Sequence, residues 1–197
     1  MIVFFSILKT ALYACLVQNL IFSGAYGMSE TVRLAKRPKH FFMTTLSVTA
    51  FSVVLGVASY FFDSMTIFEN LPLSFRFFFY VLILTFLYFI TAFIFKTVFS
   101  ADKKFLNSLG MCAVNTLVLA VPLLNYKASH SLYEVIGTGI GTGLAFTLSL
   151  ILINSGMKFI WRNKAIPDFF KGTPALFIYT ALLALTISCI SGESLFI

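Results

Sequence analysis

Residues 16–30 read LVQNLIFSGAYGMSE and interrupt an otherwise apolar N-terminal segment. The stretch carries two amides, Gln18 and Asn19, followed by Ser23, Gly24 and Gly27. Polar groups and non-helical backbone are tolerated at membrane depth only where protein or a polar cavity satisfies their hydrogen bonds. The stretch therefore predicts a broken helix at a position that matters for function.

The composition predicts that the chain lies in a membrane. Of its 197 residues, 59% are hydrophobic, only 11% are charged and 25 are Phe, which leaves too little polar surface for a soluble domain. Apolar runs long enough to cross about 30 Å of hydrocarbon occupy residues 2–24, 41–62, 74–97, 107–125, 134–156 and 174–192. We predict an all-α integral membrane protein with six transmembrane helices in one domain, residues 1–197. The first run is expected to be a span and not a cleaved signal peptide, because no basic region precedes it.

The basic residues predict the orientation. They concentrate in the first, third and fifth loops, whereas the second and fourth loops hold only Arg76 and Lys127 beside acidic residues. Because cytoplasmic loops are enriched in Lys and Arg, these three loops are expected in the cytoplasm and both termini outside it. The net charge of +7 is thus explained by topology, and no nucleic-acid partner is expected.

The two halves of the sequence resemble each other. At an offset of about 97 residues, Val17-Gln18-Asn19-Leu20 aligns with Val114-Asn115-Thr116-Leu117. The same offset places the second span on the fifth and the third on the sixth. Since each half holds an odd number of spans, the halves would cross the membrane in opposite directions. We predict an inverted 3+3 repeat, residues 1–100 and 101–197, with broken first and fourth helices.

The broken helices predict a polar site near the membrane midplane. Its candidate residues are Gln18, Asn19, Ser29, Asn115 and Thr116. The alternative is that these side chains only hold helices together, as amides and hydroxyls often do in membranes. No buried carboxylate series suggests a proton relay, and His40 and His130 are expected on opposite sides of the membrane, so hydrolytic chemistry is not predicted.

The glycines of GTGIGTG, residues 137–143, predict close helix packing. A dinucleotide loop of the form G-x-G-x-x-G would need glycine at Thr142 and a preceding strand. The spacing instead gives two overlapping small-xxx-small faces on the fifth span, formed by Gly137, Gly139, Gly141 and Gly143. The three cysteines, Cys15, Cys112 and Cys189, fall within predicted spans and form no ligand motif.

Four stretches, in order and spread over nearly the whole chain, resemble a known family. They are VQNLIFSGAYGMS near the first span, VNTLVLAVPLLN in the fourth, YEVIGTGIGTG in the fifth and AIPDFFKG before the last. These stretches are similar to the six-span subunits shared by the Rnf electron-transport complex and the sodium-pumping NADH:quinone reductase (Rnf-Nqr). The RnfA/NqrE branch is the most similar, and the chain resembles a divergent member of it.

The resemblance implies a cofactor and a partner. Such subunits pair with a homologous six-span subunit of inverted topology, and together they hold a 2Fe-2S cluster through one Cys from each broken helix. Electron transfer through the cluster is coupled to Na⁺ or H⁺ transport. At the corresponding positions this chain has Ser29 and Thr116, and hydroxyls are poor ligands for iron–sulfur clusters. The cluster is therefore expected to be absent or altered here, with Cys112, four residues before Thr116, as a candidate substitute ligand.

Three functions follow as alternatives. The first is a membrane subunit of an Rnf/Nqr-like complex in the bacterial inner membrane, coupling electron transfer to Na⁺ or H⁺ translocation without being itself the catalyst. The second is a cluster-free relative that transports an ion or a small solute through the polar site. The third is a structural subunit whose polar residues serve packing alone.

Overall fold

The computed structural model describes residues 2–35, 41–65 and 71–191. The described chain is built from helices: α1 (Ile2–Leu12), the π-helix η1 (Tyr13–Val17), α2 (Leu20–Gly24), α3 (Met28–Ala35), α4 (Phe41–Asp63), α5 (Leu73–Val98), α6 (Lys103–Ala113), α7 (Thr116–Lys127), α8 (Leu132–Arg162) and α9 (Thr173–Ser191). The predicted all-helical class is confirmed. The predicted interruptions of the first and fourth helices are also confirmed, at residues 18–19 and 114–115.

Membrane-spanning length and apolar composition coincide in four described segments, Phe41–Asp63, Leu73–Val98, Phe105–Lys127 and Leu132–Arg162, the third of which contains most of α6, the break after it and α7. Two shorter apolar helices, Val3–Val17 and Thr173–Cys189, match the first and last predicted spans. The first is short because η1 ends at the break before Asn19. A helix with an interior break exposes backbone groups that need partners, so the surroundings of both breaks decide whether this fold is stable.

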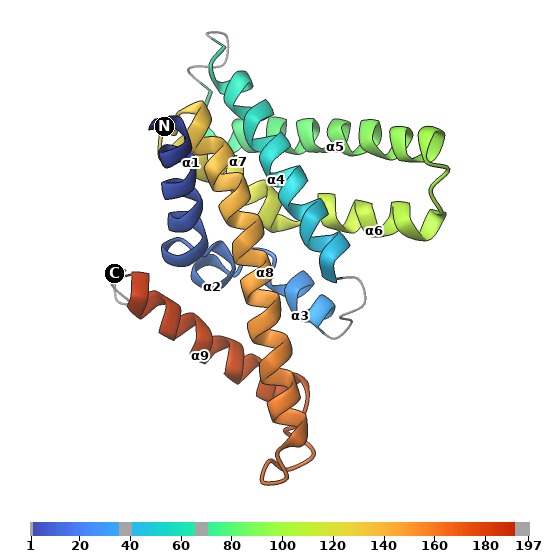
Figure 1. Cartoon of the computed structure of the whole chain (residues 1–197), viewed down its shortest axis with the longest axis vertical. Coiled ribbons are helices and arrows are strands. Elements are labelled where there is room, and N and C mark those ends of the chain that lie inside the picture. Colours follow the sequence, from blue (N-terminus) through green and yellow to red (C-terminus); the bar gives the residue numbers. More distant parts are fainter. Residues whose placement is uncertain (1, 36–40, 66–70, 192–197) are drawn as a thin grey trace.

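The helices around α4 and α8 are arranged in matching sets (Figure 1). Helix α8 packs against α1, η1, α2, α3 and α9, and α4 packs against α6, α7 and α5. Exchanging the halves of the chain converts one set of neighbours into the other, because α1 and η1 correspond to α6, α2 and α3 to α7, and α5 to α9. Helices α4 and α8 also pack against each other, so the two halves join along their middle spans.

The apolar core surrounds the two breaks. Ile21, Leu117 and Val118 are fully buried beside Val48 of α4 and Phe146 of α8. By contrast, most of α5 faces outward, with Phe86 and Phe93 among its exposed aromatic residues. In a lipid environment apolar surface needs no burial, so α5 presents the composition of a helix that contacts acyl chains.

The glycines of α8 lie where neighbouring helices approach most closely. A Cβ atom on Gly137 or Gly141 would meet the backbone of α1, and one on Gly139 or Gly143 would meet α4. Two faces of α8, offset by two residues, therefore each hold a different helix at close contact. Small residues are the usual means of such close packing in membranes.

Gly139→Ala is expected to destabilise the chain by about 2 kcal/mol. A Cβ there would lie 2.8 Å from Val53 Cα and 3.0 Å from Val53 N, and this backbone cannot move without shifting α4. Gly110→Ala is the matched control, since the nearest atoms to its Cβ would belong to the Tyr88 side chain, with the hydroxyl oxygen at 3.0 Å. Unfolding in a denaturing-detergent titration measures both, and equal losses would contradict the assigned α4–α8 contact.

Candidate functional site

The first break is organised by Asn19. Helix α1 widens into η1, which closes when the backbone N–H of Gln18 donates to the Tyr13 carbonyl at 2.9 Å. The side chain of Asn19 then caps α2, accepting from the N–H groups of Ile21 at 3.2 Å and Phe22 at 3.4 Å. Its Nδ2 donates to the Cys15 carbonyl at 3.2 Å. One buried amide thereby satisfies backbone groups on both sides of the break.

The second break repeats this device with Asn115. Helix α6 ends at Ala113, and Asn115 takes an extended backbone conformation as the N-cap of α7. Its Oδ1 accepts from the Leu117 N–H at 3.0 Å. The side chain is 2% exposed, so the cap lies inside the protein, where an unpaired donor would be costly.

The equivalent caps correct the alignment of the two halves by one residue. Asn19 and Asn115 are both N-cap residues, and they are separated by 115 − 19 = 96 positions. The sequence comparison instead gives an offset of about 97, which aligns Asn19 with Thr116. The offset of 97 aligns identical residues at both ends of the two stretches, Val17 with Val114 and Leu20 with Leu117. The capping role, which needs a carbonyl side chain just before the helix, sets the register instead.

The two breaks touch each other through Gly27. Its backbone N–H donates to Thr116 Oγ1 at 2.9 Å. Its φ of +73° is in the left-handed region that favours glycine. A Cβ on Gly27 would lie 2.9 Å from both Asn115 Oδ1 and Leu117 Cβ. The glycine thus lets the backbone after the first break lie directly against the cap of the second.

The predicted polar site divides into two groups of residues. Asn19 and Asn115 are buried and their side-chain oxygens are used as caps, while Gln18 is half-buried. Ser29, in the first turn of α3, and Thr116, the first residue of α7, are exposed. Asn19 and Asn115 therefore stabilise the breaks, and the two hydroxyls reach the surface of the chain.

These residues are a poor donor set for an iron–sulfur cluster. Thr116 Oγ1 already accepts a backbone hydrogen bond, and neither hydroxyl offers the soft thiolate that such clusters need. Cys112 is 5% exposed and lines a cavity of about 110 Å³ with Asn115, Thr44 and Glu30. Cys112 lies near the end of α6 and Thr116 begins α7, so the four residues that separate them do not form one continuous helical turn. Within residues 2–35, 41–65 and 71–191, no three His, Cys, Asp or Glu side chains gather into a metal-binding group.

Thr116→Val is expected to cost about 1–2 kcal/mol of stability, because it leaves the Gly27 N–H without its acceptor. Thr116→Ser keeps the hydroxyl and should restore most of the loss. Thermal melting of the two variants in the same detergent checks this, and equal melting temperatures would mean that the hydrogen bond between the breaks contributes nothing.

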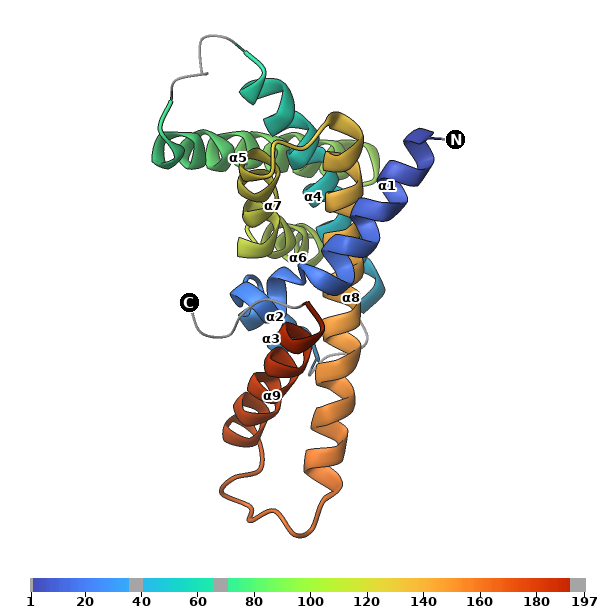
Figure 2. The same cartoon turned by 90° about the vertical axis from the view of Figure 1, so that its left-hand side faces the viewer.

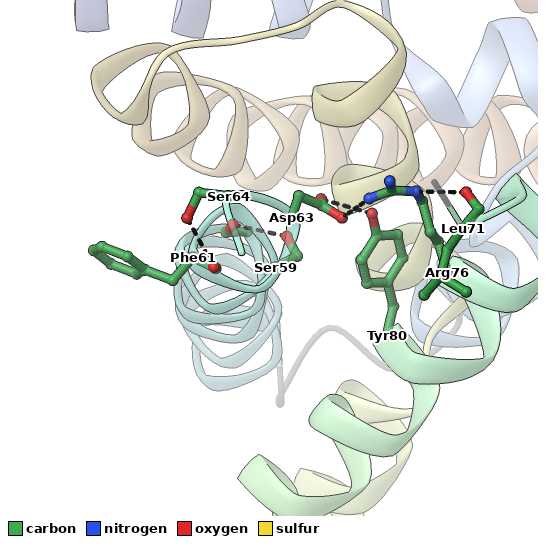
Figure 3. A network of polar contacts seen from close by, with 8 residues as sticks. Ser59, Phe61, Asp63, Ser64, Leu71, Arg76 and Tyr80 are labelled. Atoms are coloured by element: carbon green, nitrogen blue, oxygen red, sulfur yellow. Dashed lines mark hydrogen bonds and ion pairs between the residues drawn. The ribbon is translucent and has the colours of Figure 1, made fainter. Parts of the chain in front are cut away.

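A second polar cluster, which the sequence did not predict, lies between α4 and α5 (Figure 3). Arg76 is 1% exposed and pairs with Asp63 at 2.6 Å, and Tyr80 donates to the other Asp63 oxygen at 2.7 Å. The Arg76 Nε donates to the Leu71 carbonyl at 3.1 Å, and the guanidinium lies 4.2 Å from the centre of the Tyr126 ring. The available signal was the four-residue spacing of Arg76 and Tyr80, which places both on one helix face.

The chain is similar in sequence to known membrane-protein subunits. The sequence model of the Rnf-Nqr family, described as a membrane protein and Rnf-Nqr subunit, matches residues 7–193. A subunit of the ion-translocating oxidoreductase complex of Aromatoleum aromaticum is 34% identical over 84 residues, or 43% of each chain. A subunit of the proton-translocating ferredoxin:NAD(+) oxidoreductase complex of Clostridium ljungdahlii is 33% identical over 82 residues, or 42% of each chain.

These alignments span less than half the length of the curated relatives, whereas the family match covers almost the whole chain. That match includes both breaks, the glycines of α8 and the final helix. The chain belongs to the Rnf-Nqr family of membrane-protein subunits.

Proposed function

We propose that the chain is a membrane subunit of an ion-translocating electron-transport complex, coupling electron transfer to Na⁺ or H⁺ movement. The observation that carries the proposal is the contact of two capped helix breaks, with the Gly27 N–H on Thr116 Oγ1 at 2.9 Å. Its relatives are named as subunits of such complexes. Redox partner subunits are part of the proposal, and the bacterial inner membrane is the proposed location, with both termini outside the cytoplasm.

The surface beside the breaks supports a partner of the same kind. We call it the break face, and its exposed residues are Ser23, Gly24, Ala25, Tyr26, Ser29, Val114 and Thr116. It includes irregular backbone, since Ala25 takes the left-handed conformation with φ of 56°. Irregular backbone is not left facing lipid at membrane depth. A homologous six-span subunit of inverted topology would cover it, and the chain would enter the pair as one domain of two repeats.

The proposal assigns no iron ligand to this chain. Ser29 and Thr116 occupy the positions where relatives are expected to supply cysteines, and both carry hydroxyls. A family-type 2Fe-2S cluster at this interface would therefore depend on ligands from the partner.

Affinity purification of the tagged chain in mild detergent, from the membranes of its own host, tests the assembly. We expect a second membrane subunit of similar size to co-purify in a fixed ratio, together with redox subunits. A chain that purifies alone, as a monomer or as a dimer of itself, would contradict the proposal.

Ser29→Ala is expected to leave the iron and acid-labile sulfide of the purified assembly unchanged, because the hydroxyl is not a ligand. Ser29→Cys is the informative companion, since a thiolate at this position could add a ligand. A loss of iron in Ser29→Ala at unchanged subunit content would show oxygen ligation and would contradict this part of the proposal.

A second candidate function, transport of an ion or small solute without a cluster, is favoured by the hydroxyls themselves. Ser29 and Thr116 are exposed beside two breaks and could coordinate a hard cation. The amides Asn19 and Asn115 add little to such a site because their oxygens are occupied by caps. Cation flux in vesicles containing the purified chain alone would favour this candidate. A structural subunit would show neither flux nor redox activity in the assembly.

A further inference from the structure

A groove of about 680 Å³ lies between the end of α8 and the start of α9. Figure 2 shows these helices separating towards the loop that joins them. Met157, Ile160 and Leu176 give the groove apolar walls, and Lys158 and Arg162 are exposed along it. No Asp or Glu is among the described residues that line it. The groove therefore combines an apolar interior with positive charge.

The two cations are available to a ligand. Lys158 and Arg162 are four residues apart, so they share one face of α8. Neither side chain forms an ion pair or hydrogen bond with another residue in the described part of the chain. Lys171, by contrast, is paired with Asp168 at 2.8 Å.

The length of α8 sets the depth of these cations in the membrane. Its 31 residues rise about 46 Å at 1.5 Å per residue, which exceeds the ~30 Å hydrocarbon core. Counting about 20 residues from Glu134 ends the hydrocarbon part near Asn154. Lys158 and Arg162 then lie at the level of lipid headgroups. Between them, Trp161 is 64% exposed, as expected for tryptophan at a membrane interface.

We propose that this groove binds an anionic phospholipid, with its phosphate on Lys158 and Arg162 and an acyl chain along Met157, Ile160 and Leu176. Basic pockets between membrane helices suit anionic headgroups through charge complementarity. An acidic protein segment would use the charges but would leave the apolar walls unfilled, whereas a phospholipid satisfies both. The proposal does not depend on whether electrons pass through the chain.

Trp161 provides the test, because it is the chain's only tryptophan. The full chain is reconstituted in phosphatidylcholine vesicles containing increasing fractions of phosphatidylglycerol with brominated acyl chains, which quench tryptophan on contact. Quenching is expected to saturate at low phosphatidylglycerol content. The relative association constant of brominated phosphatidylglycerol should exceed that of brominated phosphatidylcholine by on the order of tenfold, because two cations attract its phosphate.

The double variant Lys158→Gln, Arg162→Gln should lose this preference and bind the two lipids equally. The matched control, Lys96→Gln with Lys103→Gln, removes the same charge at the junction of α5 and α6 and should keep it. Quenching by phosphatidylcholine, unchanged in all variants, verifies the depth of Trp161. Equal quenching by both lipids in the unmodified chain would overturn the proposal. So would protection of Trp161 from both lipids in the purified assembly, which would show a protein subunit covering the groove.

Discussion

Replacing Gly27 by alanine is expected to destabilise the chain by about 3 kcal/mol and to separate the two helix breaks. Two costs combine. The φ of +73° is unfavourable for a residue with a Cβ atom, and that Cβ would lie 2.9 Å from Asn115 Oδ1 and Leu117 Cβ. Relieving this crowding would move the Gly27 N–H away from Thr116 Oγ1 and disturb the Asn115 cap.

Gly24→Ala is the matched control for Gly27→Ala. The nearest atoms to a Cβ on Gly24 would belong to the ring of Tyr26, which is 44% exposed and can turn away. We expect a loss below about 1 kcal/mol for this helix-end position. Unfolding titrations in one detergent system measure both variants. If Gly27→Ala proves as stable as Gly24→Ala, the breaks are not packed as described.

Removing the carboxylate of Asp63 should cost about 3 kcal/mol, because it leaves the charge of Arg76 buried without its counter-ion. The guanidinium is 1% exposed, and the carboxylate is its partner at 2.6 Å. We place the cost at the lower end for a buried pair because the Asp63 side chain keeps 16% of its exposure. Tyr80 would lose its acceptor in the same substitution.

The double variant Asp63→Leu, Arg76→Met should recover much of the loss seen in Asp63→Leu alone, since it removes both charges. Thermal melting of Asp63→Leu, Arg76→Met and the double variant gives the interaction free energy between the two side chains. Asp168→Asn, which breaks the ion pair with Lys171 at the surface, should leave melting unchanged. Additive effects at Asp63 and Arg76 would contradict the pairing.

The helices and both breaks could be predicted from the sequence. Apolar runs of membrane-spanning length indicate the helices, and clustered amides and glycines within such runs indicate the breaks. The capping contacts of the amides could not be predicted. The sequence predicts Asn19 and Asn115 as residues of a polar site, and the structure shows that their oxygens cap α2 and α7. Asparagine is suited both to capping a helix and to lining a polar site. Only the backbone geometry after the break distinguishes the two roles.

Contacts distant in sequence were also beyond prediction. The hydrogen bond between Gly27 and Thr116 joins residues 89 positions apart, and nothing local to either residue indicates it. The sequence comparison of the loops counts Arg76 with the second loop, whereas it lies in α5, buried against Asp63 and Tyr126. Its burial depends on the packing of α5 against α4 and α7, which a single sequence does not encode locally.

We propose that the break face docks a second membrane subunit, and site-specific photocrosslinking can detect this contact in the membrane. A photoreactive amino acid would replace Tyr26 or Val114, both exposed on that face, in the membranes of the host. Phe93, exposed near the C-terminal end of α5, serves as the control. We predict that both break-face positions crosslink to the same membrane protein of similar size, and that Phe93 gives only lipid adducts. Lipid adducts alone at Tyr26 and Val114 would show that the break face contacts no second subunit.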